Sequence, residues 1–319
     1  MSAVLNAVDD ASPPDPMVRA AWLYYVEDLT QAQIARLMSV TRARVIALLA
    51  GARDAGLVRV HIDASASGQL ALRQRLIAQY ALRDAVVAPS ASRTSHVAAM
   101  VGHAAGRFLS ERLRDGMTVG IGWGATLHMA LKAIEPRSRD RLAVVSLLGG
   151  TTHSRPMAPP AVARRLADML RAECYQLTAP LVVADEANRA ALWAEPALRD
   201  LRERARRVDL ALLSVGDVSA DATLFASDVL PRSAVRELAS AGAVGDVLCR
   251  FVDAHGAAVD HALNRRMMAV DPADLAAVPE VVVASGGRAK APALRGALKA
   301  LRVTTLITDE AAASALLDG

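Results

Sequence analysis

The sequence predicts two folded parts: a small all-α (winged) helix-turn-helix domain, followed by a large α/β domain with a mostly parallel sheet. In residues 17–62, short helical patterns are separated by a few residues and followed by a short alternating run. From residue 81 onward, apolar strand-like runs alternate with helical stretches, which is typical of βαβ units. The chain has 319 residues, a length that accommodates two domains.

The composition excludes several classes of protein. Apolar residues make up 53% and charged residues 22% of the chain, the balance of a soluble globular protein. No run reaches the roughly 18 consecutive apolar residues of a membrane span. The first sixteen residues carry three aspartates and no Lys or Arg, unlike a secretory or transit signal. Cys174 and Cys249 form no CxxC pair, so we expect a cytoplasmic protein without a disulfide framework or a metal site.

The expected domain boundaries follow changes in composition. Residues 1–16 are rich in Pro and Asp and predict a disordered arm. Residues 17–63 form the predicted helix-turn-helix domain, and residues 64–80 a linker with a connecting helix. Residues 81–319 form the predicted α/β domain.

Three helices are predicted in the N-terminal domain. The first begins at Met17 with an apolar stripe made of Val18, Ala21, Trp22 and Tyr25. The second follows a capping box of Thr30 and Gln33, and its expected buried face consists of Ala32, Ile34, Ala35 and Leu37. Thr41 is expected to cap the third helix, from Arg42 to about Ala52, and residues 57–62 alternate like a short strand.

The charge of this domain is suited to DNA. Residues 17–62 contain six arginines and three acidic residues, a net charge of +3. In a helix-turn-helix, the second helix enters the major groove with its first residues toward the base edges. The expected DNA contacts come from five residues of these helices: Gln31, Arg36, Thr41, Arg42 and Arg44. The alternative is a packing module of three helices whose arginines are simply solvated.

Strands and helices alternate through the rest of the chain. The candidate strands are residues 84–88, 118–122, 142–148, 210–215, 281–284 and 304–308. The candidate helices are residues 95–114, 161–172, 188–206 and 289–301. Residues 245–259 alternate up to a turn at 253–256, which resembles a hairpin added to the main sheet. Such a sheet binds ligands beyond the carboxyl ends of its strands, where this sequence places its glycines.

One long run in the N-terminal domain resembles the SorC/DeoR-type sugar-responsive transcriptional regulators: LTQAQIARLMSVTRARVIALLAGARDAGLVRVHI. That family typically shows LTQ-x-x-IA-x-x-L, a short turn, a Ser/Thr-Arg pair and a closing GLV wing. Two features depart from the pattern, because Ser39 replaces the usual turn glycine and Ile46-Ala47 stands where the family has a Ser-Arg pair. The resemblance implies binding to double-stranded operator DNA, whereas the departures leave the operator sequence open.

The C-terminal part extends the resemblance through motifs in the family's order: VGIGWGATLHMAL (119–131), VVSLLGG (144–150), LLSVGD (212–217), GAVGDVLCRFVDAHG (242–256), HALNRRMMAV (261–270), VVVASGGRAK (281–290) and LITDEAAASALL (306–317). The family's effector domain is similar in fold to ribose-phosphate isomerase and glucosamine-phosphate deaminase. It binds a sugar phosphate or a related polyol. The resemblance therefore implies a small-molecule effector of this class.

A glycine-rich loop joins a predicted strand to a predicted helix, and it consists of Gly122, Trp123, Gly124, Ala125 and Thr126. Backbone N–H groups at a helix N-terminus can hold a phosphate, and Thr126 adds a hydroxyl group. The glycines at 120, 122 and 124 do not fit GxGxxG, and no acidic residue closes a second strand about 20 positions later. This pattern disfavours a dinucleotide, and no cofactor is expected.

Further effector contacts are predicted at other strand ends. Lys290, one of only three lysines, follows two glycines, and the resemblance places a ligand-contacting lysine in this motif, which includes Gly287. An ordinary surface lysine is the alternative. The resemblance also implies that Asp246 bonds sugar hydroxyls.

The resemblance implies a second loop made of Gly149, Gly150 and Arg155. Arg155 could pair with a phosphate bidentately. Asn264 and Arg265 lie in a further loop and are weaker candidates, because solvated polar residues are common there.

Two functional classes remain open, a ligand-controlled regulator and a sugar-phosphate isomerase or deaminase with an accessory domain. The histidines form no HExxH set and the serines have no nucleophile-elbow context, while Asp309-Glu310 is typical of a helix N-cap. Isomerisation needs a general base whose pKa is suited to the proton transfer, and Asp246 beside Lys290 could imitate such a base. Because a helix-turn-helix has no purpose in a metabolic isomerase, we expect a regulator of a carbohydrate or polyol catabolic operon and not an enzyme. Symmetric operators further imply a homo-oligomer, a dimer or a tetramer.

Overall fold

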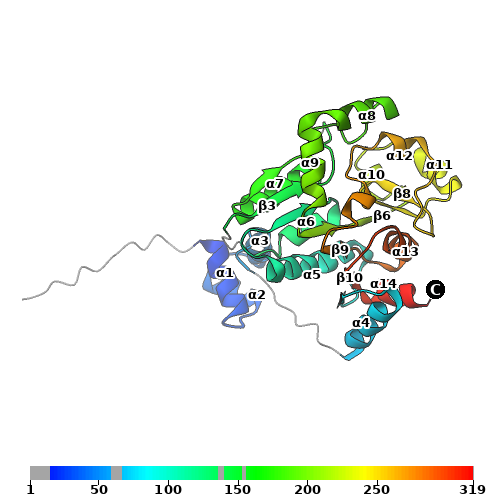
Figure 1. Cartoon of the computed structure of the whole chain (residues 1–319). Coiled ribbons are helices and arrows are strands. Elements are labelled where there is room, and N and C mark those ends of the chain that lie inside the picture. Colours follow the sequence, from blue (N-terminus) through cyan, green and yellow to red (C-terminus); the bar gives the residue numbers. More distant parts are fainter. Residues whose placement is uncertain (1–14, 59–66, 136–139, 153–155, 319) are drawn as a thin grey trace, which may run out of the picture. The chain divides into compact units, whose positions relative to one another are not determined.

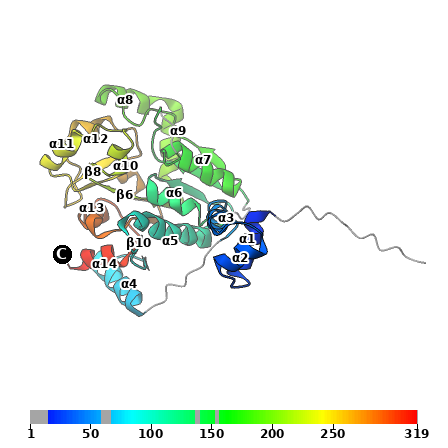
Figure 2. The same ribbon diagram turned by 180° about the vertical axis from the view of Figure 1, so that it is seen from behind.

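The computed structural model describes residues 15–58, 67–135, 140–152 and 156–318. The chain divides between Asp63 and Ala64 into two compact units. Figures 1 and 2 show the elements of both units from opposite sides. The first unit consists of α1 (Pro16–Tyr25), α2 (Gln31–Leu37) and α3 (Arg42–Asp54).

The predicted caps of the N-terminal helices are confirmed. Thr30 and Gln33 form a reciprocal capping box at α2, and the Thr41 hydroxyl accepts the backbone N–H of Arg44 at 3.2 Å. The helix α1 begins one residue earlier than expected, since Asp15 caps it by accepting the N–H of Met17 at 2.8 Å. Asp15 and Pro16 therefore belong to the helix and not to the expected arm, whose residues 1–14 lie outside the described part.

The expected burial of α1 and α2 is partly wrong. The core of this unit takes Ala20, Ala21 and Leu23 from α1, whereas Val18, Trp22 and Tyr25 are exposed. Only Ile34 and Ala35 of α2 are buried, and Ala32 and Leu37 are exposed. A short helix that packs on one side against a small core buries only a narrow stripe, so the other apolar residues of α1 and α2 remain exposed. Most of the predicted wing strand lies outside the described residues; Leu57 and Val58 alone are described, and they form no strand.

The second unit is built on a seven-stranded sheet with the order β1-β10-β9-β5-β2-β3-β4. Its strands are β1 (Asp84–Ala88), β2 (Thr118–Ile121), β3 (Ala143–Ser146), β4 (Glu173–Tyr175), β5 (Leu210–Leu213), β9 (Glu280–Ala284) and β10 (Thr305–Asp309). All neighbouring strands pair in parallel. The six candidate strands are thus confirmed, and the short edge strand β4 was missed.

Helices cover both faces of this sheet. Residues of α5 (Val97–Arg112), α6 (Ala125–Leu131) and α7 (Pro159–Leu170) form one core with Val119 and Ile121 of β2. Residues of α4 (Ser67–Tyr80), α9 (Pro196–Arg206), α13 (Ala291–Ala300) and α14 (Glu310–Leu317) form the other core with Ala211 and Leu213 of β5. Alternate residues of each strand therefore face opposite cores, as in a doubly wound α/β fold.

The predicted connecting helix α4 is part of the second unit. It lies beside α14 in both views (Figures 1 and 2), and the Tyr80 hydroxyl donates to the carbonyl of Leu316 at 2.9 Å. The remaining helical elements of this unit are η1 (Thr94–His96), α8 (Glu186–Ala194), α10 (Thr223–Ala226), α11 (Ala234–Ser240), α12 (Ala262–Arg266), η2 (Pro272–Leu275) and η3 (Arg288–Lys290). The helix expected over 188–206 is two helices, because Pro196 begins α9 and has no N–H with which to continue α8.

The hairpin expected at 245–259 does not join the main sheet. It forms a separate antiparallel sheet of β6 (Val215–Asp217), β7 (Gly245–Val247) and β8 (Arg250–Val252). Its tight turn is Leu248–Cys249, where both residues have positive φ, of 50° and 60°. The predicted turn at 253–256 exists as a second reversal, in which Val252 bridges Ala258.

Candidate functional site

The strand order of the main sheet reverses between β2 and β5. From β2 the chain moves outward through β3 to β4, then returns to β5 and continues through β9 to β10 on the other side. Ligands of such sheets bind in the crevice at the carboxyl ends of the strands on either side of this reversal. The glycine-rich loop Gly122–Thr126 follows β2, and Ser214 follows β5, so both lie at this crevice.

The loop between β2 and α6 presents backbone N–H groups. Gly122 donates its own N–H to the carbonyl of Leu212 at 2.9 Å, which ties the loop to β5. Gly124 caps α6 with φ of 108°, a conformation that favours glycine, and no side chain caps this helix. The first-turn N–H groups of a helix have no intrahelical acceptor and can therefore bind an anion. Thr126 lies in this turn and is buried.

Asp246 lies on β7, two residues before a residue that contacts this loop. Its Oδ2 accepts the backbone N–H of Cys249 at 3.0 Å. The adjacent Leu248 contacts the loop, since its Cδ2 lies 3.6 Å from the position a Cβ would take at Gly122. Burial raises the pKa of Asp246 to about 6; the charge of Lys290 opposes this rise and Asp217 adds to it. The site therefore holds a buried carboxyl group that can accept hydrogen bonds from hydroxyl groups.

Lys290 reaches the same place from η3. Its Nζ donates to the carbonyl of Val215 at 3.1 Å, and the Ser285 hydroxyl donates to the same oxygen at 3.2 Å. Ser214, one residue earlier, has its Oγ 3.9 Å from the Cβ position of Gly124. The segment after β5 thus brings together the glycine-rich loop, Lys290 and, through the pairing of Gly216 with Asp246, the buried acid.

A cavity of about 540 Å³ opens beside Trp123. Trp123 forms part of its wall and also interacts with the thiol of Cys249, whose pKa is raised by burial. The other walls come mainly from the loop after β3 and the segment after β4, and they include Gly150, Thr151, Thr152, Gln176 and Thr178. Trp123 therefore links the cavity to the turn that holds Asp246.

Other predicted effector residues lie in the loops that follow the neighbouring strands β3 and β9. Gly149 and Gly150 lie in the loop after β3, where their N–H groups donate to the carbonyls of Met268 and Ala179, both at 2.8 Å. The N–H of Gly287 donates to Asp309 at 2.8 Å. Arg155 lies outside the described residues. Two cavity residues, Thr151 and Thr152, were missed, although they directly follow the glycine pair after a strand.

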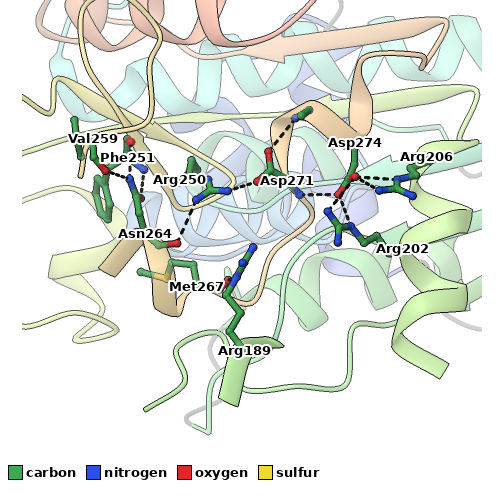
Figure 3. A network of polar contacts seen from close by, with 11 residues as sticks. Arg189, Arg202, Arg206, Arg250, Phe251, Val259, Asn264, Met267, Asp271 and Asp274 are labelled. Carbon is green, nitrogen blue, oxygen red and sulfur yellow. Dashed lines mark hydrogen bonds and ion pairs between the residues drawn. The ribbon is translucent and has the colours of Figure 1, made fainter. Parts of the chain in front are cut away.

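Asn264 and Arg265 have partners in the scaffold. Asn264 is buried; its amide group donates to the carbonyls of Phe251 and Val259 and accepts the N–H of Phe251 (Figure 3). Arg265 forms ion pairs with Asp260 and Glu186. Both N–H groups of the Asn264 amide are therefore used in holding β8 against the segment that follows it.

Figure 3 also shows an arginine–aspartate network beside Asn264. Asp274 accepts hydrogen bonds from Arg202 at 2.6 Å and from Arg206 at 2.6 Å. Burial of Asp274 opposes its charge, but the hydrogen bonds and charges of Arg202 and Arg206 outweigh burial and lower its pKa. Arg250 pairs with Asp271, and Arg189 donates to the carbonyl of Met267 at 2.9 Å. The network ties α8 and α9 to the segments around α12 and η2.

The candidate DNA-binding face lies on α2 and α3. Arg36, Arg42 and Arg44 are exposed, as is Thr41, whose hydroxyl group is engaged as the α3 cap. The Oε1 of Gln31 accepts the Nε of Arg42 at 3.3 Å, which joins the start of α2 to the start of α3. Of the five predicted residues, Gln31 and Arg42 thus meet across the two helices, while Arg36, Thr41 and Arg44 are exposed on them.

No cluster of His, Cys, Asp and Glu able to hold a metal occurs among the described residues. None of the described helices is long and apolar enough to cross a membrane. A small helical unit followed by a doubly wound unit with a crevice at its strand reversal is the architecture expected of a ligand-responsive transcriptional regulator.

Comparison with known proteins identifies the family. The family model described as "Putative sugar-binding domain" matches residues 64–318. The erythritol catabolism regulatory protein EryD of Brucella abortus is 32% identical over 304 residues, covering 94% of this chain and 95% of that protein. The transcriptional regulator LsrR of Klebsiella pneumoniae is 30% identical over 307 residues, covering 94% of this chain and 92% of that protein. The chain therefore belongs to the SorC/DeoR-type regulators that carry a sugar-binding domain.

The fold agrees with this assignment. The full-length sorbitol operon regulator SorC from Klebsiella pneumoniae matches with a TM-score of 0.70 at 23% identity, covering 94% of this chain and 98% of that chain. A regulator of the DeoR family from Listeria monocytogenes matches with a TM-score of 0.72 at 22% identity, covering 78% of this chain and 100% of that chain.

Proposed function

We propose that this chain represses or activates a carbohydrate or polyol catabolic operon in response to a sugar phosphate or polyol that binds at the crevice between β2 and β5. The observation that carries this proposal is the convergence at Ser214–Gly216 of three features: the glycine-rich loop, Lys290 and Asp246. Because its proposed target is operator DNA, we expect the protein in the cytoplasm.

The chemistry of the site favours a polyhydroxylated effector. The carboxyl group of Asp246 can accept hydrogen bonds from hydroxyl groups, and the cavity presents Thr151, Thr152 and Thr178 beside Trp123. A phosphate on the effector would bind the first turn of α6, with the ammonium group of Lys290 supplying charge. Two relatives, the regulators of erythritol catabolism and of the sorbitol operon, are named for polyols.

Effector control requires two states of the protein with different affinities for the effector, because a ligand of equal affinity shifts no equilibrium. We infer a homo-oligomer, a dimer or tetramer, since one recognition helix covers only a few base pairs and symmetric operators match symmetric proteins. The alternative, an isomerase-like enzyme, needs a base that moves a substrate proton. In a regulator, Asp246 instead accepts hydrogen bonds from the effector and moves no proton.

The test is calorimetric titration of the full chain with erythritol, sorbitol and their phosphates, alongside operator binding. Lys290→Ala should weaken binding of a phosphorylated effector at least tenfold and leave operator binding without effector unchanged. Lys299→Ala is the matched control, because its exposed Nζ donates to the carbonyl of Ala254 on another part of the unit. Equal effector affinity of both variants, or turnover of any of these compounds, would overturn the proposal.

A further inference from the structure

The recognition helix α3 has one buried side. Its buried residues are Val45, Leu48, Leu49 and Ala52, which are at most 6% exposed and pack in the core of the first unit. Successive residues of an α-helix are rotated by about 100°. The residues opposite this buried side are therefore the ones that project farthest from the core.

Apolar residues occupy that opposite side in the first two turns. Ala43, Ile46 and Ala47 are spaced i, i+3 and i+4, a spacing that puts them on one face, and all three are exposed. Ile46 is 47% exposed. We refer to these three residues as the apolar face of α3.

The arginines lie on the two flanks of this face. Arg42 and Arg44 are the neighbours of Ala43 in sequence, so a rotation of about 100° places them on opposite sides of it. The bond between Arg42 and Gln31 holds Arg42 toward the start of α2. When a helix enters a groove, flanking cations face the sugar-phosphate strands, while the central face approaches the base edges.

The geometry points to an operator read through thymine methyl groups by the apolar face of α3, with Arg42 and Arg44 on the phosphates. The C5-methyl of thymine is the apolar group on the major-groove edge, and apolar side chains contact it. Ala43 and Ala47 are small enough to let the helix approach the bases closely. This inference rests on the proposed DNA-binding function and specifies which bases of the operator the helix contacts, namely thymines.

The test uses the full-length protein and an operator isolated from a randomised DNA library. Each thymine of that operator is replaced in turn by uracil, which removes only the methyl group. Wild-type affinity should fall about fourfold at one or more positions, the effect of losing one buried methyl contact. Ile46→Ser, Ala47→Ser and Ala43→Ser should each abolish the effect of uracil at the thymine that the replaced side chain contacts.

Val18→Ser is the matched control, because Val18 is an exposed apolar residue on α1. It should keep the wild-type uracil profile. Thermal unfolding checks that each variant is folded, which is expected because the replaced side chains are exposed. The inference would be overturned if operator binding were insensitive to uracil. It would also be overturned if all three α3 variants kept the wild-type uracil profile. Either result would leave the regulator function intact. Failure to select any DNA would overturn the proposed function itself.

Discussion

Gly216 and Asp246 lie opposite each other in the antiparallel pair β6–β7, and the acid fills the space that a side chain at Gly216 would take. A Cβ built on Gly216 would be 2.1 Å from Oδ1 of Asp246. No real contact is that short, so the absence of a side chain at residue 216 is a condition for the position of the carboxyl group. The buried acid is thus placed by a residue on another strand.

Replacement Gly216→Ala should therefore displace Asp246 and weaken effector binding at least tenfold, with a loss of about 1–3 kcal/mol in the free energy of unfolding from overpacking. Calorimetry and urea unfolding measure the two quantities. Gly68→Ala serves as the control, because nothing lies within 4 Å of its Cβ position. Unchanged effector affinity in Gly216→Ala would contradict the assignment of Asp246 to the site.

The pH dependence of stability should reveal Asp246. Burial raises its pKa from 3.8 to about 6, so the native state binds this proton more tightly than the unfolded state. The free energy of unfolding should then fall as pH rises between about 4 and 6, by up to about 3 kcal/mol. Asp246→Asn should lack this fall and gain stability relative to the wild type across that window.

Urea unfolding of both proteins at several pH values gives the difference. Asp221→Asn, which changes an exposed carboxyl group of the same unit, should follow the wild type. A difference between Asp246→Asn and wild type that stays constant from pH 4 to pH 7 would show that Asp246 titrates normally.

Asp274 should have the opposite pH dependence. Its pKa is lowered by Arg202 and Arg206, so its contribution is present above the unfolded-state pKa of about 3.9 and is lost as pH falls through the folded-state pKa. Asp274→Asn should lower the free energy of unfolding at pH 7 by about 2 kcal/mol, because it leaves two arginines without their carboxylate. Thermal and urea unfolding measure this loss.

Asp168→Asn is the comparison for that variant. Asp168 pairs with Arg164 at 2.9 Å, but both side chains are at least 60% exposed, so the expected cost is below about 0.5 kcal/mol. Equal costs for Asp274→Asn and Asp168→Asn would show that the network in Figure 3 contributes no more than an exposed pair.

Arg42 and Arg44 should act through the DNA backbone. The double replacement Arg42→Ala, Arg44→Ala should weaken binding to all DNA sequences alike and reduce the slope of log affinity against log salt by about 2. Fluorescence anisotropy at several salt concentrations measures this slope. Arg199→Ala, an exposed charge of the other unit, should change neither quantity. A loss of about 1–3 kcal/mol in binding free energy that depends on the identity of one base pair would instead show that an arginine contacts that base. Full retention of affinity would show that α3 is not part of the DNA interface.

The sequence by itself determined the local features of this protein. Thr30, Thr41 and Asp309 were predicted as helix caps and cap α2, α3 and α14, because a cap joins a side chain to an N–H group only a few residues away. The main strands were predicted for a similar reason, since a buried parallel strand needs an apolar run that is visible without its partners. The glycine-rich loop after β2 could likewise be placed at a strand end.

Only the tertiary structure decided which faces are buried and which distant groups meet. Helical spacing marked Val18, Trp22 and Tyr25 as one stripe, yet the small core accepts Ala20, Ala21 and Leu23, because burial depends on the surface that α2 and α3 present. Asn264, predicted as an effector contact, has hydrogen bonds to Phe251 and Val259 that the sequence did not indicate. The approach of Asp246 to Lys290 depends on the pairing of β7 with β6 in a separate sheet. No local pattern reveals this pairing, since strand partners are chosen by contacts between segments far apart in the chain.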